Sequence, residues 1–119
     1  MNDERFTTDL ARLRAALAGL DHVTETVSYG TPMFKAGRTK SSQRMLTRLR
    51  EPGVVVLPVA SEDDKRLLIE AAPDVYFTVP HYDGYSLVLA RMDQISDAEL
   101  LHRLKIAWEL VARRTNVRR

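Results

Sequence analysis

One stretch of nine residues, from Val27 to Lys35, constrains the fold of this chain more than any other. It reads VSYGTPMFK, with Gly30, Thr31 and Pro32 at its centre. Glycine tolerates positive φ, and proline fixes its own φ and drives the preceding residue into an extended conformation. The stretch therefore predicts a chain reversal at Gly30, an extended Thr31, and β-sheet on both sides of the bend.

Short strand-like segments surround this bend. Residues 23–29 alternate in polarity and are rich in β-branched side chains, which is typical of a strand. The turn at 51–53 has proline followed by glycine, a type II signature, so its flanking strands are predicted to pair antiparallel. The other predicted strands are 33–36, 44–50, 54–59, 75–79 and 85–92, with a polar loop at 37–42. The run at 54–59 is continuously apolar, which predicts burial on both faces of the sheet.

Three segments show helical signals. The first is 3–18, the second starts at the cap Ser61, and the third starts at Ser96 with Glu99 completing a capping box. The side chains predicted to face the core are Phe6, Leu10, Leu13 and Leu17 in the first helix. In the second they are Leu67, Leu68 and Ala71, and in the third they are Leu100 or Leu101, Leu104, Trp108 and Val111. The predicted fold is α+β: one domain over residues 1–119, with about six antiparallel strands in the order α-β4-α-β2-α. The helices are expected to pack mainly on one face of the sheet.

Composition excludes several classes of protein. The chain has no cysteine, which rules out a disulfide framework and a thiolate metal site. No apolar run approaches the ~20 residues of a membrane span, and the polar N-terminal residues do not form a signal peptide. We therefore expect a cytoplasmic protein without a membrane partner. The histidines lack metal-binding spacing, so neither a metal nor a cofactor is expected.

Positive charge is concentrated in residues 31–50, which contain six basic and no acidic residues. The six are Lys35, Arg38, Lys40, Arg44, Arg48 and Arg50. Because side chains alternate along a strand, the last three are predicted to share one face. A hairpin with a cationic tip and stem suits contact with nucleic-acid phosphates. The alternative is a solvated outer face neutralised by carboxylates, for example those at 62–64.

The chain resembles the MmcQ/YjbR-like family. The resemblance rests on the Val27–Lys35 stretch, on RMLTRL at 44–49, on APDVYF at 72–77, on TVPHYDG at 78–84 and on the helix at 100–113. It implies an α+β double-wing DNA-binding motif with DNA as partner and no known catalytic activity. The chain departs from the family pattern at Leu46, where an aromatic residue is common, and at Tyr85-Ser86, where a tryptophan is common. The connection at 37–43 is also longer than usual.

A second hypothesis is a small-ligand or protein-interaction domain with a pocket near Tyr29, Thr31, His81 and Tyr82. His81 beside Asp83 has the outline of a general base, although such a histidine more often only holds a loop together. No nucleophile motif is present. We therefore predict a non-catalytic binding module, and an enzyme would require His81 to pair with a second polar group in a cleft.

Overall fold

The computed structural model describes residues 6–116, with side chains up to residue 112. Its helices are α1 (Thr7–Leu17), α2 (Glu62–Ala71) and α3 (Asp97–Asn116). Its strands are β1 (Val23–Ser28), β2 (Thr31–Ala36), β3 (Arg44–Glu51), β4 (Val54–Pro58), β5 (Tyr76–Phe77) and β6 (Leu87–Arg91). The first helix was predicted to start at residue 3, and residues 3–5 of that prediction lie outside the described residues.

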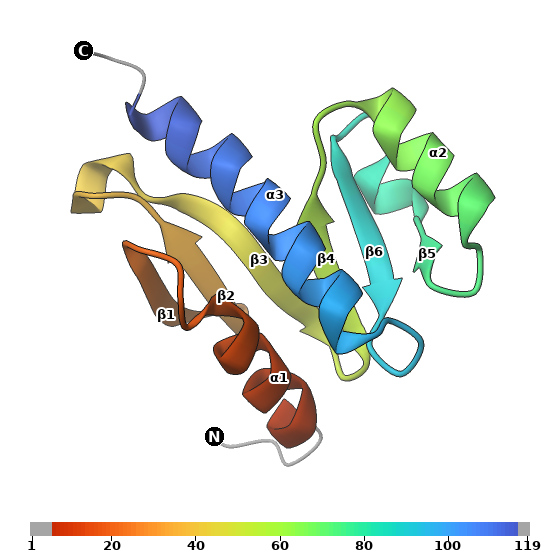
Figure 1. Cartoon of the computed structure of the whole chain (residues 1–119), viewed down its shortest axis with the longest axis horizontal. Helices are drawn as coiled ribbons and strands as arrows, with labels where there is room; N and C mark the ends of the chain where they lie inside the picture. The colour runs from red at the N-terminus through yellow and green to blue at the C-terminus, as the bar shows by residue number, and fades with distance from the viewer. Residues whose placement is uncertain (1–5, 117–119) are drawn as a thin grey trace.

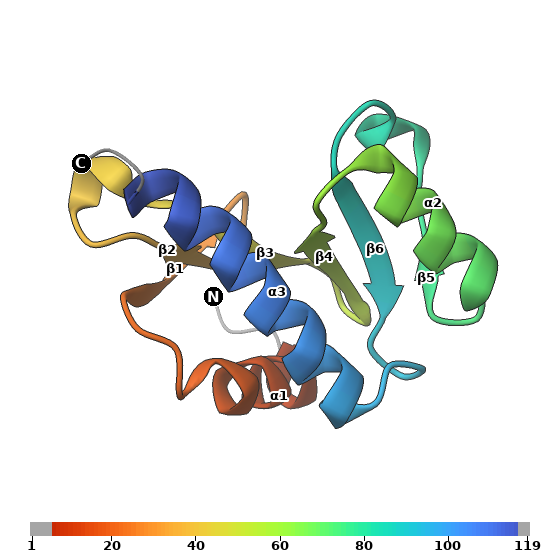
Figure 2. The ribbon, with the colours of Figure 1, turned by 45° about the horizontal axis from the view of Figure 1, so that its top comes forward.

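The six strands form one antiparallel sheet in the order β1-β2-β3-β4-β6-β5 (Figure 1). All three helices lie on the same side of this sheet, as the two ribbon views agree (Figure 2). Helix α3 crosses β3 and β4, and α2 lies beside β5 and β6. The predicted fold class and order of elements are therefore confirmed. We call the side of the sheet without helices the outer face.

The predicted reversal at Gly30 is a two-residue hairpin turn. Tyr29 and Gly30 both have positive φ, 53° and 79°, as a type I′ turn requires. The register of β1 on β2 runs without interruption from Val23 opposite Ala36 to Ser28 opposite Thr31. Thr31 is thus extended, as predicted. A positive φ is unusual for a bulky residue such as Tyr29, and this side chain is 94% exposed.

Two hydrophobic clusters lie on the two faces of the sheet. The main core lies between the sheet and the helices and contains Leu13, Leu46, Leu57 and Leu104 among others. A smaller cluster on the outer face contains Val56, Tyr82 and Leu89. The middle residues of β4 enter both clusters, because neighbours along a strand point to opposite faces. This confirms the predicted two-sided burial of that strand.

The inner face of α2 differs from the prediction. Leu67 is 60% exposed and Ala71 is also exposed, whereas Lys65 and Leu68 face inward. Lys65 is only 7% exposed, and its Nζ donates to the carbonyl oxygens of Tyr82 at 2.7 Å and Tyr85 at 3.1 Å. The backbone of the 82–85 turn thus supplies the acceptors that make a lysine tolerable at an inward position.

Two smaller predictions also need correction. Strand β5 is shorter than the predicted 75–79, and the loops at 37–42 and 80–84 each contain a 3₁₀ turn. Trp108 is half-buried at the edge of the core, where its indole N–H donates to the carbonyl of Asp21 at 2.9 Å.

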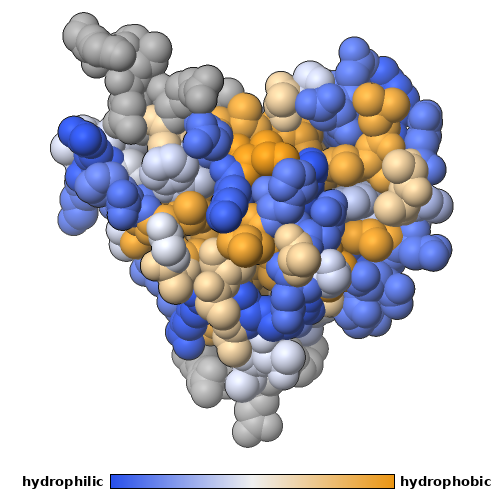
Figure 3. Space-filling model, viewed as in Figure 1, coloured by the Kyte–Doolittle hydropathy of each residue, from blue (hydrophilic) through white to orange (hydrophobic). Residues whose placement is uncertain are grey.

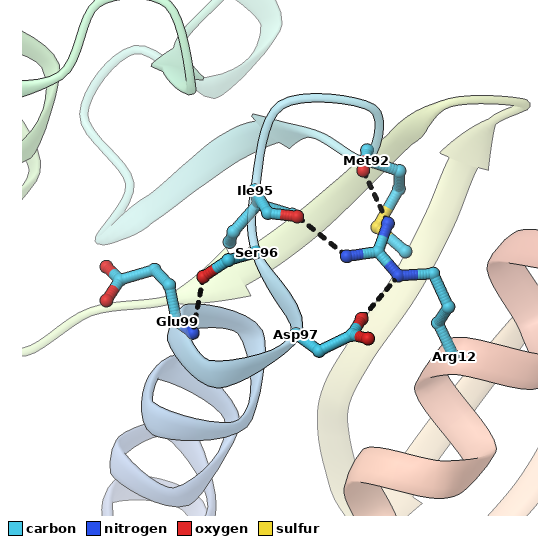
Figure 4. Close-up of polar contacts among 6 residues, drawn as sticks. All are labelled: Arg12, Met92, Ile95, Ser96, Asp97 and Glu99. Atoms are coloured by element: carbon cyan, nitrogen blue, oxygen red, sulfur yellow. Dashed lines mark hydrogen bonds and ion pairs between the residues drawn. The ribbon is translucent and has the colours of Figure 1, made fainter.

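Arg12 links α1 to the segment that leads into α3 (Figure 4). Its Nε donates to Asp97 at 2.7 Å, and its terminal nitrogens donate to the carbonyl oxygens of Met92 at 2.5 Å and Ile95 at 2.6 Å. The predicted cap beside it is present, since the Ser96 hydroxyl accepts from the backbone N–H of Glu99 at 3.0 Å. The guanidinium thereby fixes the angle at which the last helix starts.

Removal of Arg14 is expected to raise the titration midpoint of Glu25. Two hydrogen bonds from the Arg14 guanidinium, at 2.9 and 2.7 Å, lower the pKa of the Glu25 carboxyl, and the ion-pair attraction adds to this effect. A lowered folded-state pKa stabilises the fold above the ordinary glutamate pKa, and this contribution is lost as the pH falls through the folded-state value. The contribution is small, because both side chains are substantially exposed.

The check is an NMR titration of the Glu25 carboxyl in the native protein and in Arg14→Gln. The midpoint should move up in the variant. Equal midpoints in the two proteins would contradict the assignment.

Candidate nucleic-acid interface

The outer face of β1, β2 and β3 carries part of the predicted basic run. Residues paired across an antiparallel ladder share a face. Lys35 is opposite Met45, which packs on the outer cluster, and Arg48 is opposite Val56, which belongs to it. Lys35 and Arg48 therefore both lie on the side of the sheet away from the helices.

Arg44 does not share this face, so the prediction that Arg44, Arg48 and Arg50 line up is wrong. From the pair Lys35–Met45 to the pair Phe34–Thr47, β3 advances by two residues while β2 advances by one. This bulge exchanges the two faces. As a result Arg44 is opposite Ala36, whose side chain is buried in the main core on the helix side.

Arg50 leaves the candidate set for two reasons. The β3–β4 register has a second irregularity between Leu49 and Glu51, at Arg50 itself. In addition, the Arg50 guanidinium is paired with Glu51, with an Nη1–Oε1 distance of 2.9 Å. Among the described side chains, Arg50 thus already has a carboxylate partner, unlike the other five cations.

The connection between β2 and β3 is a structured loop that presents two cations. Thr39 caps the 3₁₀ turn Lys40–Ser42, with reciprocal side-chain and backbone hydrogen bonds to Ser42. The Gln43 amide donates to the Thr24 hydroxyl at 3.2 Å, which ties the loop to β1. Arg38 and Lys40 are exposed on this loop.

Arg44 lies at the base of the same loop. Its guanidinium donates to the carbonyl oxygens of Ser41 at 3.1 Å and Gln43 at 2.9 Å. These bonds fix the position of the guanidinium without neutralising it, because the acceptors are uncharged.

Five of the six predicted cations lack a carboxylate partner among the described side chains. In residues 6–112 no acidic side chain lies within ion-pair distance of Lys35, Arg38, Lys40, Arg44 or Arg48. We call these five residues the basic surface. Arg48 donates to the Thr31 hydroxyl at 3.2 Å, while its Nε is buried without a hydrogen-bond partner.

Hydroxyl groups on β1 extend this surface, and the sequence reasoning missed them. Thr24 is opposite Lys35, and Thr26 is opposite Met33, so both lie on the outer face beside the basic surface. The alternation along β1 was the available signal. It showed two faces, but it did not show which of them the helices would cover.

The predicted pocket of Tyr29, Thr31, His81 and Tyr82 does not form. Tyr29 and Thr31 lie in the β1–β2 hairpin at one edge of the sheet, whereas 80–82 lies beyond β3 and β4 at the other side (Figure 1). Tyr82 is buried on Val56 and Leu89. Strand β3 lies between β2, which begins at Thr31, and β4, whose Val56 packs against Tyr82, so the two places are not adjacent in the sheet.

His81 contacts the Tyr82 ring edge-on, with 4.9 Å between the ring centroids. Within the described residues it makes no hydrogen bond to Asp83 or to another group. The pair that general-base catalysis would need is thus not assembled at this loop.

The strongest pKa shift is found on the helix side of the sheet. Burial raises the pKa of the Tyr76 hydroxyl, and its hydrogen bond to the Glu99 carboxylate raises it further. Tyr76 therefore stays protonated and acts as a donor that holds Glu99. In the described residues, no group of three histidine, aspartate or glutamate side chains is arranged to hold a metal ion.

Comparison with solved structures gives a clear match. The crystal structure of Deinococcus radiodurans protein DR2400, a DUF419 domain, superposes with a TM-score of 0.73 and 25% sequence identity. The superposition covers 86% of this chain and 77% of that one. The chain has the fold of a DUF419 domain. DUF419 is also known as the MmcQ/YjbR-like family, so the sequence resemblance and the structural likeness point to the same fold.

Sequence relatives are uncharacterised. Mycobacterium tuberculosis Rv2570 and Mycobacterium bovis Mb2600 are each 40% identical over 77 residues, which is 61% of this chain. The match spans 60% of the length of these relatives. No protein-family model matches the chain. None of the described helices is long and apolar enough to cross a membrane.

Proposed function

We propose that this chain is an MmcQ/YjbR-like, non-catalytic module of the cytoplasm that binds nucleic acid through the basic surface. The observation that carries the proposal is the set of five cations that have no carboxylate partner in the part of the chain whose side chains are described. A cation already paired with a carboxylate has little to gain from a phosphate, whereas an unpaired one releases counterions when it binds. The hydroxyls of Thr24 and Thr26 add neutral donors of the kind that contact phosphate oxygens.

The proposed contact is with the sugar-phosphate backbone. The basic surface is divided between the outer face, which carries Lys35 and Arg48, and the adjoining loop, which carries Arg38 and Lys40. Two aromatic rings of the outer face offer no stacking surface, because Tyr82 is buried and the Phe77 ring is covered by the Arg91 guanidinium at 4.2 Å. The exposed ring of Tyr29 lies at the opposite end of β2 from the loop that carries Arg38 and Lys40. Binding without base stacking is expected to depend strongly on salt and weakly on base sequence.

Charge reversal in the loop is expected to weaken DNA binding. For Arg38→Glu/Lys40→Glu we expect at least about a tenfold loss of affinity for a 20-base-pair duplex at low ionic strength. The slope of log K against log salt concentration should fall by about 2, since two phosphate contacts are removed. The measurement is a fluorescence-anisotropy titration over a series of salt concentrations, and adding Arg44→Glu should extend both effects.

The matched control is Arg66→Glu/Lys105→Glu, which changes the net charge by the same amount. Both of these residues are exposed on helices, on the opposite side of the sheet. The control should bind DNA nearly as well as the native protein. Equal losses in the two double variants, or no salt-dependent binding by the native protein, would remove the proposal.

A further inference from the structure

A groove of about 380 Å³ lies between α2 and α3, away from the basic surface. Leu67, Leu68 and Ala71 of α2 form one wall, and Ile106 of α3 lies on the other. Val59 and Ala60, which follow β4, also line it. Figure 3 shows the corresponding hollow between the two helices, with hydrophobic residues at its floor. Its size is within the range of sites that hold small molecules.

Leu67 gives this groove an apolar surface that the fold does not use. Its side chain is 60% exposed, although leucine at this position of α2 was expected to face the core. Packing within the domain therefore does not explain the residue. A large apolar side chain on a concave surface is a common feature of ligand-binding grooves.

Arg103 places a guanidinium group with unused donors beside the groove. Its side chain is 17% exposed and lines the groove, and its Nε is buried without a hydrogen-bond partner. Within the described residues it forms one ion pair, with Glu99, at an Nε–Oε2 distance of 3.5 Å. Glu99 in turn accepts the hydroxyl hydrogen of Tyr76. In the described part of the chain, neither terminal nitrogen of the guanidinium donates a hydrogen bond, so these two nitrogens, and not the buried Nε, are the donors that a ligand can use.

The charges around Arg103 indicate which acceptor fits. Asp64 lines the same groove, and Glu99 lies beside the guanidinium, so two carboxylates accompany one cation. An anionic ligand would meet net repulsion, whereas a carbonyl oxygen accepts a hydrogen bond without adding charge. We propose that the groove binds an uncharged apolar molecule with one carbonyl group, such as an acyl chain in a ketone, ester or amide, and that Arg103 donates to the carbonyl oxygen.

Two probes of equal chain length test this assignment: 2-nonanone, which is neutral, and nonanoate, which is anionic. Titration of each into the ¹⁵N-labelled protein, followed by amide NMR shifts, should give saturable shifts at 58–72 and 99–107. We expect 2-nonanone to bind more tightly than nonanoate. In Arg103→Met, a variant of similar size, 2-nonanone should bind about tenfold more weakly because its hydrogen bond to a charged donor is lost.

A pair of alanine-to-tryptophan variants tests the location. Ala71→Trp should fill the groove and abolish binding of both probes. Ala11→Trp, in the separate groove between α1 and α3, should leave binding unchanged. Thermal unfolding monitored by circular dichroism establishes that each variant is folded, and Arg103→Leu, which also lacks a donor, replaces Arg103→Met if the latter is not. The proposal is overturned by absence of saturable shifts, by tighter binding of nonanoate, or by an effect of Ala11→Trp equal to that of Ala71→Trp.

Discussion

Replacement of Lys65 by methionine is expected to lower the free energy of unfolding by about 3 kcal/mol, because two hydrogen bonds from a charged donor are lost together. Its ammonium group is buried and donates to the carbonyl oxygens of Tyr82 and Tyr85, 17 and 20 residues further along the chain. Methionine preserves the length of the side chain but leaves both carbonyls without this donor. The connection between β5 and β6 then loses its attachment to α2.

Urea unfolding followed by circular dichroism measures this loss. The control is Lys105→Met, at an exposed position of α3, which should change stability by less than about 0.5 kcal/mol. Amide hydrogen exchange of residues 78–86 should also accelerate in Lys65→Met, since the connection can open locally. Equal stability of the two variants would show that the buried ammonium contributes nothing net to the fold.

Lys65 also illustrates what the sequence could not reveal. Its position on the inner stripe of α2 follows helical spacing, but a lysine is normally assigned to the solvent side. Only the backbone carbonyls of a distant turn make its burial tolerable, and no local pattern encodes their position. The same reasoning predicted that Leu67 faces the core. That prediction relied on the hydrophobicity of the side chain and not on which side of α2 packs against the sheet.

The bulge in β3 also depends on a segment other than its own, and it made part of the predicted site wrong. Residue types and spacing were sufficient to predict strand 44–50 and its basic residues. Alternation then placed Arg44 and Arg48 on one face, which holds only for an uninterrupted ladder. A single extra residue between them reverses the outcome, and its presence depends on how β2 and β3 pair.

The turns and helix caps, by contrast, could be predicted from the sequence. The reversal at Gly30, the glycine of the 51–53 turn and the caps at Ser61 and Ser96 are each local, because the residues that determine the conformation are neighbours in sequence. These signals fixed the order of elements and hence the antiparallel sheet. The proposed pocket failed because it joined two local motifs without knowing the order of strands between them.

Replacement of Gly37 by alanine is expected to disturb both stability and the basic surface. A Cβ atom at Gly37 would lie 2.7 Å from the Ser42 carbonyl oxygen, 2.7 Å from the Gln43 Cα and 2.8 Å from the Gln43 nitrogen. All three are backbone atoms, so no side-chain rotation can relieve the overlap. The loop must open, and we expect a loss of about 2–3 kcal/mol in the free energy of unfolding.

The matched control is Gly19→Ala, where a new Cβ meets no atom within 4 Å. That variant should be as stable as the native protein or slightly more stable, because alanine restricts the unfolded chain. DNA affinity should also be measured for Gly37→Ala. Opening of the loop displaces Arg38 and Lys40, so DNA binding should weaken although the net charge of the protein is unchanged. Native DNA affinity in a destabilised but folded Gly37→Ala would mean that total charge, and not the arrangement of this loop, attracts the polyanion.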